Sequence, residues 1–298
     1  MSLAEAQAAE LALERQSGLW RDAFDRFRRN PAALTGVVFV LAFVAAAIFA
    51  SQIAPFEPNQ QVGPLSTNPA GPGGDHLMGL DEQGRDLFSR LLYGARLSLL
   101  VGVVSVGIGL AVGLVFGAIA GYVGGWVDTV IMRIMDLMLS VPSLLVAIGL
   151  VTLLGRGMVQ IMIAVGVTTV PIFARLLRGS ILGQREADYV LAARSVGVPG
   201  RRLLLGHIMP NSIAPVIVQA TLTMATAIIE VAALSFVGLG PQDPSLPEWG
   251  KIMADNANRL ESAAHLVLFP GFAIVLSTIG LNLIGDGLRE AIDPKLKS

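Results

Sequence analysis

The stretch LSLLVGVVSVGIGLAVGLVFGAIAGYV, residues 97–123, decides the fold, because no charged side chain occurs between Arg96 and Asp128. About 20 apolar residues are enough for an α-helix to cross the hydrocarbon core of a bilayer. The whole chain has the same character: of its 298 residues, 53% are hydrophobic and 14% are charged, and the mean hydropathy is +0.67. Soluble domains carry about 25% charged residues. The sequence therefore predicts an integral membrane protein.

Five further apolar stretches are separated by polar segments. They favour helices, because only helices or closed barrels satisfy backbone hydrogen bonds in lipid, and the alternating pattern of barrel strands is missing. The predicted fold is an all-α integral membrane protein with six transmembrane helices. Besides residues 97–123, the expected spans are 33–51, 131–154, 158–177, 212–239 and 265–284.

The distribution of lysine and arginine orients these spans. If the N-terminus is cytoplasmic, the inside segments hold 15 of the 21 basic residues and the outside segments hold six. Both termini are therefore predicted to be cytoplasmic. The first apolar run, of about 19 residues, exceeds the 7–15 of a cleavable signal peptide, so we interpret it as a retained anchor. The predicted organisation is a cytoplasmic tail with an interfacial helix (1–30), the first span (33–51), an extracytoplasmic segment (52–95), a five-helix core (96–288) and a cytoplasmic tail (289–298).

A polar interruption with six arginines, residues 174–211, separates the fourth and fifth spans. Residues 186–196 favour a short helix that ends at Gly197 and Pro199, because glycine takes the left-handed cap and proline cannot continue the turn. A second helix, residues 201–209, is expected to end at Pro210. The apolar edge of the first helix suits insertion into a groove on a partner, although a surface hairpin with no partner is the alternative. This edge comprises Tyr189, Val190, Ala193 and Val196.

Small residues recur at every fourth position of the second span. Such a stripe lets another helix approach closely in lipid, and the partner helix is expected either in this chain or in a second subunit. The stripe comprises Ser105, Gly109, Gly113, Gly117 and Gly121.

Glu230 is the one acid placed well inside a predicted span. An ionised carboxylate there costs at least about 2.5 kcal/mol unless it meets water or a partner. Two interpretations stay open: Glu230 lines an aqueous pathway, or it locks two helices through a buried hydrogen bond. Near the start of the third span, Arg133 and Asp136 are expected to pair. Pro142 and Pro171 are expected to kink their helices.

The sequence argues against catalysis by this chain alone. It lacks the G-x-x-x-x-G-K-[ST] loop of ATP-binding proteins, the nearest fragment being Gly250-Lys251-Ile252. It has no cysteine, and its three histidines are far apart, so no metal site is expected. No nucleophile elbow or zinc-protease helix occurs. We therefore expect no cofactor on this chain, and any energy source belongs to a partner.

The run Ala192-Ala193-x-x-x-Gly197, with Pro210 thirteen residues after the glycine, resembles the cytoplasmic "EAA" motif of importer permeases. Leu191 stands at the glutamate position of that motif, which puts an ionic contact there in doubt. The His207-x-x-Pro-Asn form is similar to the peptide branch. From about residue 20 onward, the chain resembles inner-membrane permease subunits of bacterial ABC importers for dipeptides and oligopeptides, which include glutathione and nickel relatives. Further similar stretches are 79–90, 234–240, 247–250, 285–289 and 293–295.

This resemblance implies a type I ABC importer permease that moves short peptides across the bacterial inner membrane. It implies a homologous second permease, two cytoplasmic ATPase subunits that carry ATP and Mg, and an extracytoplasmic binding protein, with no nucleic acid. The outer loop 241–259, with an interfacial Trp249, is expected to meet the binding protein, and Glu230 is expected near the pathway. Alternative cargoes are glutathione or a nickel chelate, and an ion-coupled secondary transporter is the rival class. The residues expected to couple to the ATPase are Tyr189, Val190, Ala192, Ala193, Arg194, Val196, Gly197, His207 and Pro210.

Overall fold

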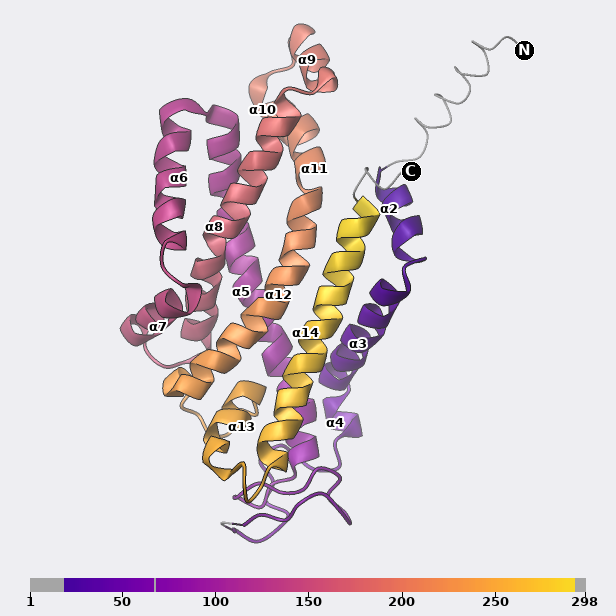
Figure 1. The fold of residues 1–298 in the computed structure, drawn as a ribbon, viewed down its shortest axis with the longest axis vertical. Coiled ribbons are helices and arrows are strands. Elements are labelled where there is room, and N and C mark those ends of the chain that lie inside the picture. Colours follow the sequence, from indigo (N-terminus) through magenta and orange to yellow (C-terminus); the bar gives the residue numbers. More distant parts are fainter. Residues whose placement is uncertain (1–18, 67, 293–298) are drawn as a thin grey trace, which may run out of the picture.

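The computed structural model describes residues 19–66 and 68–292, and these residues form a bundle of long helices (Figure 1). The long helices are α3 (Pro31–Ile48), α5 (Leu87–Val123), α8 (Met158–Arg185), α12 (Ala214–Leu234) and α14 (His265–Ile292). The shorter ones are α2 (Leu19–Phe27), α4 (Ala50–Ile53), α6 (Gly125–Leu139), α7 (Ser143–Leu154), α9 (Asp188–Ser195), α10 (Gly200–Leu203), α11 (Met209–Ser212) and α13 (Trp249–Asp255). Three single turns complete the set: η1 (Leu204–Ile208), η2 (Ser235–Leu239) and η3 (Ala257–Arg259).

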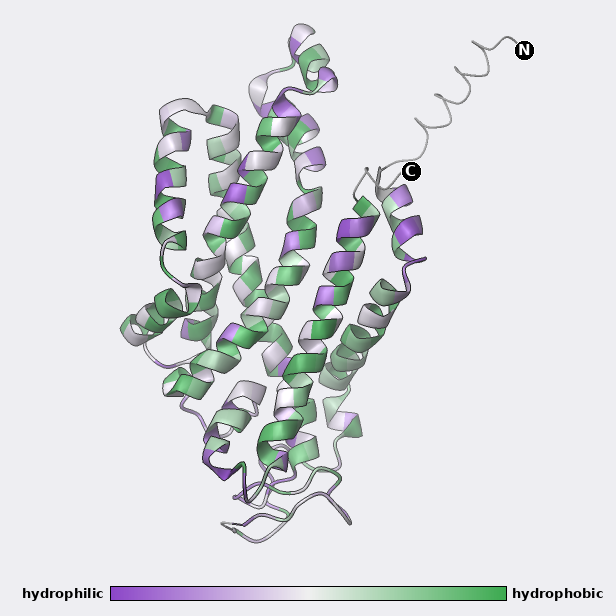
Figure 2. Cartoon of the chain, in the orientation of Figure 1, coloured by the Kyte–Doolittle hydropathy of each residue, from purple (hydrophilic) through white to green (hydrophobic). Residues whose placement is uncertain are grey.

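Five helical segments in the described residues are long and apolar enough to cross a membrane, namely α3, α5, α8, α12 with η2, and α14. A sixth crossing is made if α6 and α7 count as one span. The predicted all-α membrane fold is therefore confirmed, with five or six spans in the described residues. Hydrophilic residues concentrate toward the two ends of the bundle (Figure 2). One end carries α9, α10, α2 and the end of α14, and the other carries α13 and the segment 54–86 (Figure 1). We call these the α9 end and the α13 end.

The third predicted span is not one straight helix. α6 and α7 meet at 90°, because the helix ends near Ser140 and Pro142 stands before the first residue of α7. A proline has no backbone N–H to donate and its ring clashes with the preceding turn, so the expected kink is a complete break. Pro171 lies inside α8, which continues to Arg185.

The glycine stripe of α5 packs against α8 of the same chain, which decides between the two expected partners. A Cβ added at Gly113 would lie 2.6 Å from Cβ of Phe173, and one at Gly117 would lie 2.6 Å from the carbonyl oxygen of Ala174. Side chains are therefore excluded at these positions, and the two backbones touch. Gly109 and Gly121 meet Thr169 and Ile181 of α8 in the same way. Dispersion contacts along this seam hold the centre of the bundle together, as expected in lipid.

Ion pairs join α6 to α8. Asp136 pairs with Arg175, and Asp128 accepts two hydrogen bonds from Arg178 at 2.5 and 2.6 Å. The expectation that Asp136 pairs with Arg133 is therefore wrong. The physical reason is that α8 runs beside α6 and brings a guanidinium to each aspartate from outside their own helix.

The interfacial helix α2 docks on the last turns of α14. Ala23 is buried, whereas Phe24 is 65% exposed, so α2 presents an aromatic side chain away from the bundle. A Cβ added at Gly287 would lie 3.4 Å from the ring of Phe27, which places Phe27 against α14. The Asn30 side chain then caps α3 by accepting from the Ala33 backbone N–H at 3.1 Å.

Candidate functional site

The helix α9 is held against the bundle by buried side chains. Val190 of α9 is fully buried in the same cluster as Ile181 of α8, and Leu203 and Ile208 from α10 and η1 join that cluster. The Cβ position of Gly200 lies against the Tyr122 hydroxyl near the end of α5. The helix–turn–helix predicted from the polar interruption is therefore present, and it contacts α8 and the end of α5. The prediction that the second helix ends at Pro210 is wrong, because Pro210 stands in the first turn of α11 and the chain continues from α11 into α12.

The turn after α9 has the geometry expected from Gly197. That residue has φ of +80°, which an L side chain rarely adopts, and its N–H donates to the Arg194 carbonyl at 3.1 Å. The N–H of Val198 donates to the Ala193 carbonyl at 3.2 Å. These two bonds form a Schellman cap, which ends α9 and reverses the chain toward Pro199.

Polar side chains tie α9 to both neighbouring helices. The Tyr189 hydroxyl donates to Oε1 of Gln184 on α8 at 2.6 Å. The side-chain amide of Asn211 on α11 donates to the His207 carbonyl at 2.9 Å and to the Tyr189 hydroxyl at 3.3 Å. Tyr189 therefore bonds α9 to α8 and to α11, and Pro210 lies within α11.

The exposed face of α9 differs from the edge expected from sequence. Val190 points into the core and Ala193 is half-buried, so neither lies on the outward surface. Leu191 is 46% exposed and Val196 is 80% exposed, and Ala192 and Arg194 are exposed with them. The sequence marked Leu191 only as a departure from the motif. Leu191 is exposed because α8 covers the opposite side of α9, where Val190 lies.

Glu230 lies where α12 meets α7. The Ser143 hydroxyl, in the first turn of α7, donates to Oε1 of Glu230 at 2.5 Å. The other carboxylate oxygen, Oε2, is buried with no hydrogen-bond partner among the residues that the structure describes. The carboxylate thus joins α12 to α7, the helix that follows the 90° break.

Sequence reasoning missed the contribution of Glu248 at the α13 end. Its carboxylate is buried, caps α13 by accepting from the N–H groups of Gly250 at 2.8 Å and Lys251 at 2.7 Å, and accepts from the Ser235 hydroxyl at 3.1 Å. Burial raises the pKa of Glu248 above its ordinary value, and these hydrogen bonds oppose the rise. A buried cap cannot be told from an exposed acid by sequence alone.

Trp249 is buried between helices, so its predicted interfacial position is wrong. Its indole N–H donates to the Leu91 carbonyl of α5 at 3.0 Å, and its ring packs edge-on against Phe43 of α3. A Cβ added at Gly94 would lie 2.9 Å from Cδ1 of this ring, and one at Gly250 would lie 2.8 Å from Cβ of Ala232. Residues 247–250 therefore lock α3, α5 and α12 together.

Residues 79–90, at the α13 end, lead into α5 and include its first turn; we call them the collar. Asp86 caps α5 by accepting from the N–H and the hydroxyl of Ser89, both at 2.8 Å, so the helix begins ten residues before the predicted span. Asp81 accepts from Arg85 at 2.7 Å and lies 3.6 Å from the buried Arg90. The side chain of Arg85 also donates to the Pro244 carbonyl at 3.2 Å. The collar is thus bonded to the loop that leads to α13.

Within residues 19–66 and 68–292, no group of three or more histidine, aspartate or glutamate side chains is placed to hold a metal ion.

A family model described as "Binding-protein-dependent transport system inner membrane component" matches residues 113–298. The chain belongs to this family. A second model, "N-terminal TM domain of oligopeptide transport permease C", matches residues 18–72. The chain is therefore a multi-pass inner-membrane component of a transport system.

Several curated members of this family are similar over nearly the whole chain. The dipeptide transport system permease protein DppC of Alkalihalophilus pseudofirmus is 46% identical, with 94% of this chain and 91% of that protein covered. The di/tripeptide transport system permease protein DppC of Pseudomonas aeruginosa is 42% identical over 93% of each chain. The glutathione transport system permease protein GsiD of Shigella flexneri is 44% identical over 93% and 91%. These relatives are named as transport permeases and not as enzymes.

A solved structure of the MetNI methionine ABC transporter, in inward facing conformations, contains a chain with the same fold. The TM-score is 0.57 at 18% sequence identity, and the match covers 68% of this chain and 96% of that chain. The predicted type I ABC importer permease fold is confirmed.

Proposed function

We propose that this chain is a permease subunit of an ATP-driven importer, with α9 as the helix that docks on a cytoplasmic ATPase subunit. The observation that carries the proposal is the two-sided character of α9. Val190 anchors one side in the core, while Leu191 and Val196 are exposed. α9 itself lies at one extreme of the bundle (Figure 1). An exposed apolar face on a helix fits a groove on a partner, and the anchored side transmits the partner's movement.

The transmission runs through rigid contacts. When ATP closes the ATPase dimer, α9 moves with it, and the Tyr189 and Asn211 bonds carry the movement to α8 and α11. α8 is packed along the glycine seam of α5, so the two helices move as one body. Rigid-body movement of packed helices between two arrangements is the recognised form of such a switch. The pathway then opens alternately at the α13 end and at the α9 end.

The basic residues support a cytoplasmic location for the α9 end. α2, α9 and α10 lie at that end (Figure 1). Four arginines belong to α2 and the turn that follows it, and Arg194, Arg201 and Arg202 belong to α9 and α10. Arg185 is the last residue of α8, just before α9. Cytoplasmic segments of membrane proteins carry an excess of lysine and arginine. The described ends of the chain lie at this same end, in agreement with both termini being cytoplasmic (Figure 1). The tail residues Lys295 and Lys297 lie outside the described residues.

The names of the relatives support short peptides as the cargo, with glutathione as an alternative within the same family. The nickel-chelate alternative rests on the sequence resemblance alone. The assembly we propose contains a homologous second permease, two ATPase subunits that bind ATP and Mg, and an extracytoplasmic binding protein that meets the collar and the loop 241–248. We place Glu230 near the pathway, because it is an acid inside α12 whose Oε2 is buried without a hydrogen-bond partner in the described residues.

The docking proposal is tested by making the exposed face of α9 acidic. In Val196→Asp, the ATPase subunits should no longer copurify, or ATP hydrolysis should continue without peptide uptake, because an interface hot spot contributes about 2 kcal/mol or more. Leu77→Asp is the matched control for copurification of the ATPase subunits, since Leu77 is 68% exposed at the opposite end. Uptake by Val196→Asp is compared with that of the unchanged protein, because Leu77 lies beside the proposed surface for the binding protein. Both variants should insert in the membrane. Unchanged copurification and unchanged uptake in Val196→Asp would refute docking through α9.

Measurement of peptide uptake also distinguishes an ATP-driven importer from the rival class, an ion-coupled secondary transporter. An ATP-driven importer loses peptide uptake when ATP is depleted and the ion gradient is maintained, whereas an ion-coupled transporter keeps it. Uptake that survives ATP depletion would overturn the ATP-driven function while leaving the fold unaffected.

A further inference from the structure

A groove of about 540 Å³ lies on the second part of the helix–turn–helix at the α9 end. It is formed by α10, the residue before α10 and η1, and it is lined by Pro199, Arg201, Arg202, Leu205 and Gly206. The same segment is anchored to the bundle, because Leu203 is buried and a Cβ added at Gly200 would lie 2.5 Å from the Tyr122 hydroxyl. The groove therefore lies on a fixed part of the structure.

The groove carries positive charge that the chain itself does not neutralise. Arg201 and Arg202 are both exposed, and within residues 19–66 and 68–292 neither guanidinium forms an ion pair. No acidic residue occurs in the sequence between Asp188, at the start of α9, and Glu230, deep in α12. The two arginines are thus free to bind an anion that comes from outside the chain.

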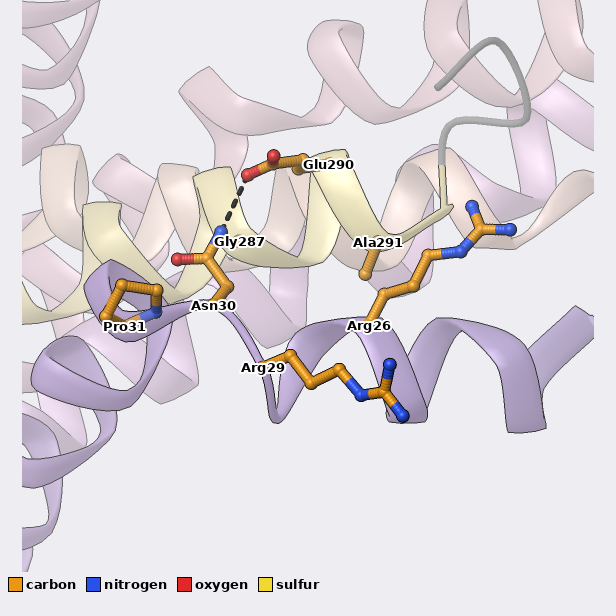
Figure 3. Close-up of a pocket in the computed structure, with 7 residues that line it drawn as sticks. All are labelled: Arg26, Arg29, Asn30, Pro31, Gly287, Glu290 and Ala291. Carbon is orange, nitrogen blue, oxygen red and sulfur yellow. Dashed lines mark hydrogen bonds between the residues drawn. The ribbon is translucent and has the colours of Figure 1, made fainter. Parts of the chain in front are cut away.

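A second basic pocket at the same end shows the opposite situation. It lies where α2, α3 and α14 meet, and Arg26 and Arg29 are among the residues that line it (Figure 3). Its lining also contains an acid, Glu290, which accepts from the side-chain amide of Asn30 at 2.6 Å, and Arg26 has an interaction partner in the chain. That corner contains an acid of its own, whereas the groove on α10 has two cations and no acid.

An exposed apolar side chain lies beside the two arginines. Leu205 lines the groove and is 55% exposed. Lipid does not account for it, because α9 and α10 lie farther along the bundle than α2, the helix predicted for the membrane interface (Figure 1). Attraction to lipid head groups also fades over about 8 Å at physiological salt. A leucine next to two cations instead fits a protein surface that combines an apolar centre with an acidic rim.

We propose that α10 and η1 form a second contact for the ATPase subunit, beside α9, and that the ATPase surface there presents carboxylates to Arg201 and Arg202. This inference rests on the proposed docking of an ATPase subunit through α9. It adds the chemistry of the partner: Leu191 stands at the glutamate position of the EAA motif, so the ionic part of docking is made by cations of this chain and acids of the ATPase. Successive residues of a helix point in different directions, so each arginine meets its own carboxylate.

The first test measures how salt affects docking. The complex is reconstituted in vesicles of phosphatidylcholine alone, which have no net charge, and the Kd of re-added ATPase subunits is measured between about 0.05 and about 0.5 M NaCl. In the unchanged protein the Kd should rise with salt. In Arg201→Gln/Arg202→Gln it should be about tenfold higher at low salt, at about threefold for each arginine, and nearly independent of salt.

The matched control is Arg21→Gln/Arg29→Gln. It removes the same charge at the same end of the molecule, from two exposed residues of α2 and its following turn that lie outside the groove. Its Kd should rise with salt as that of the unchanged protein does.

The second test identifies the groups that the arginines meet. Arg201→Lys/Arg202→Lys keeps both charges and supplies two amines, which a carbodiimide joins directly to neighbouring carboxylates with loss of water. Treatment of the assembled complex should link this segment to an aspartate or glutamate of the ATPase subunit, as located by peptide mapping. Arg21→Lys/Arg29→Lys should give no such link.

Four results would overturn the inference. Equal weakening in the two glutamine variants would show a general effect of charge. A salt effect that appears only when phosphatidylglycerol is added to the vesicles would assign the arginines to the membrane. Absence of a link from positions 201 and 202 to the ATPase would show that no carboxylate lies there. An unchanged Kd in Arg201→Gln/Arg202→Gln, with binding lost in Val196→Asp, would refute this second contact and leave docking through α9 intact.

Discussion

Replacement of Glu248 should separate its hydrogen bonds from its charge. In Glu248→Ala, the N–H groups of Gly250 and Lys251 lose their acceptor, and the Ser235 hydroxyl loses its partner. Loss of a helix cap costs about 1 kcal/mol, and a buried donor without a partner costs about 1–3 kcal/mol. The free energy of unfolding should therefore fall by about 2–4 kcal/mol. Glu248→Gln removes the buried charge but keeps only one of the two accepting oxygens, so one of the two backbone N–H groups loses its acceptor, and the free energy of unfolding should fall by less than in Glu248→Ala.

The pH dependence follows from the raised pKa of Glu248. A carboxyl group whose pKa is higher in the folded protein than in the unfolded chain binds its proton more tightly when folded. Its contribution to stability is complete below the ordinary pKa of glutamate, about 4.3, and is lost as the pH rises through the folded pKa. Lowering the pH from about 8 toward about 5 should therefore raise the stability of the unchanged protein relative to Glu248→Gln.

Tryptophan fluorescence measures this unfolding directly, because Trp249 adjoins Glu248 and is buried. The chain has no cysteine, so thiol-reactive dyes cannot report its unfolding. Melting curves of the three proteins at several pH values give the comparison. The reasoning is refuted if Glu248→Ala melts with the unchanged protein, or if the difference from Glu248→Gln shifts in the opposite direction as the pH falls.

Two further predictions concern the bundle itself. Gly113→Leu should prevent stable folding, because even a Cβ there would lie 2.6 Å from Cβ of Phe173. Gly107→Leu is the control and should fold, because Gly107 has open space around it in the same helix. Equal expression and equal melting temperatures of the two variants would contradict the packing of α5 along α8. Glu230→Gln keeps an oxygen that accepts from the Ser143 hydroxyl, so the variant should fold normally. Its peptide uptake in reconstituted vesicles should fall several-fold, because the charge near the proposed pathway is lost. Normal uptake would show that the bond to Ser143 is purely structural.

The sequence predicts those features that depend on spacing along one element. The long apolar spans, the four-residue glycine stripe and the cap at Gly197 each follow from periodicity or from backbone conformation, and each is present. Pro142 predicts an interruption of the helix, but the 90° angle between α6 and α7 was not predictable, because proline does not specify the direction of the helix that follows it.

Features that depend on a second element were missed. Asp136 has a basic neighbour three residues away in sequence, yet it pairs with Arg175 from α8. Val190 and Val196 look equivalent in sequence, but only the position of α8 shows that one is buried and the other 80% exposed. The same holds for Trp249, whose burial depends on Gly94 and Gly250 leaving room for its ring and backbone.

The uninterrupted length of α5 has a mechanical consequence. Its 37 residues make a strut about 55 Å long, capped by Asp86 beside the collar and ending where Tyr122 touches Gly200 next to α9. A hydrogen-bonded helix neither stretches nor shortens appreciably, so a push at one end cannot be absorbed along the way. A displacement of one end of α5 therefore tilts the whole helix and moves its other end. In the assembly that we propose, the binding protein on the collar and the ATPase subunit on α9 would therefore act on opposite ends of the same rigid helix.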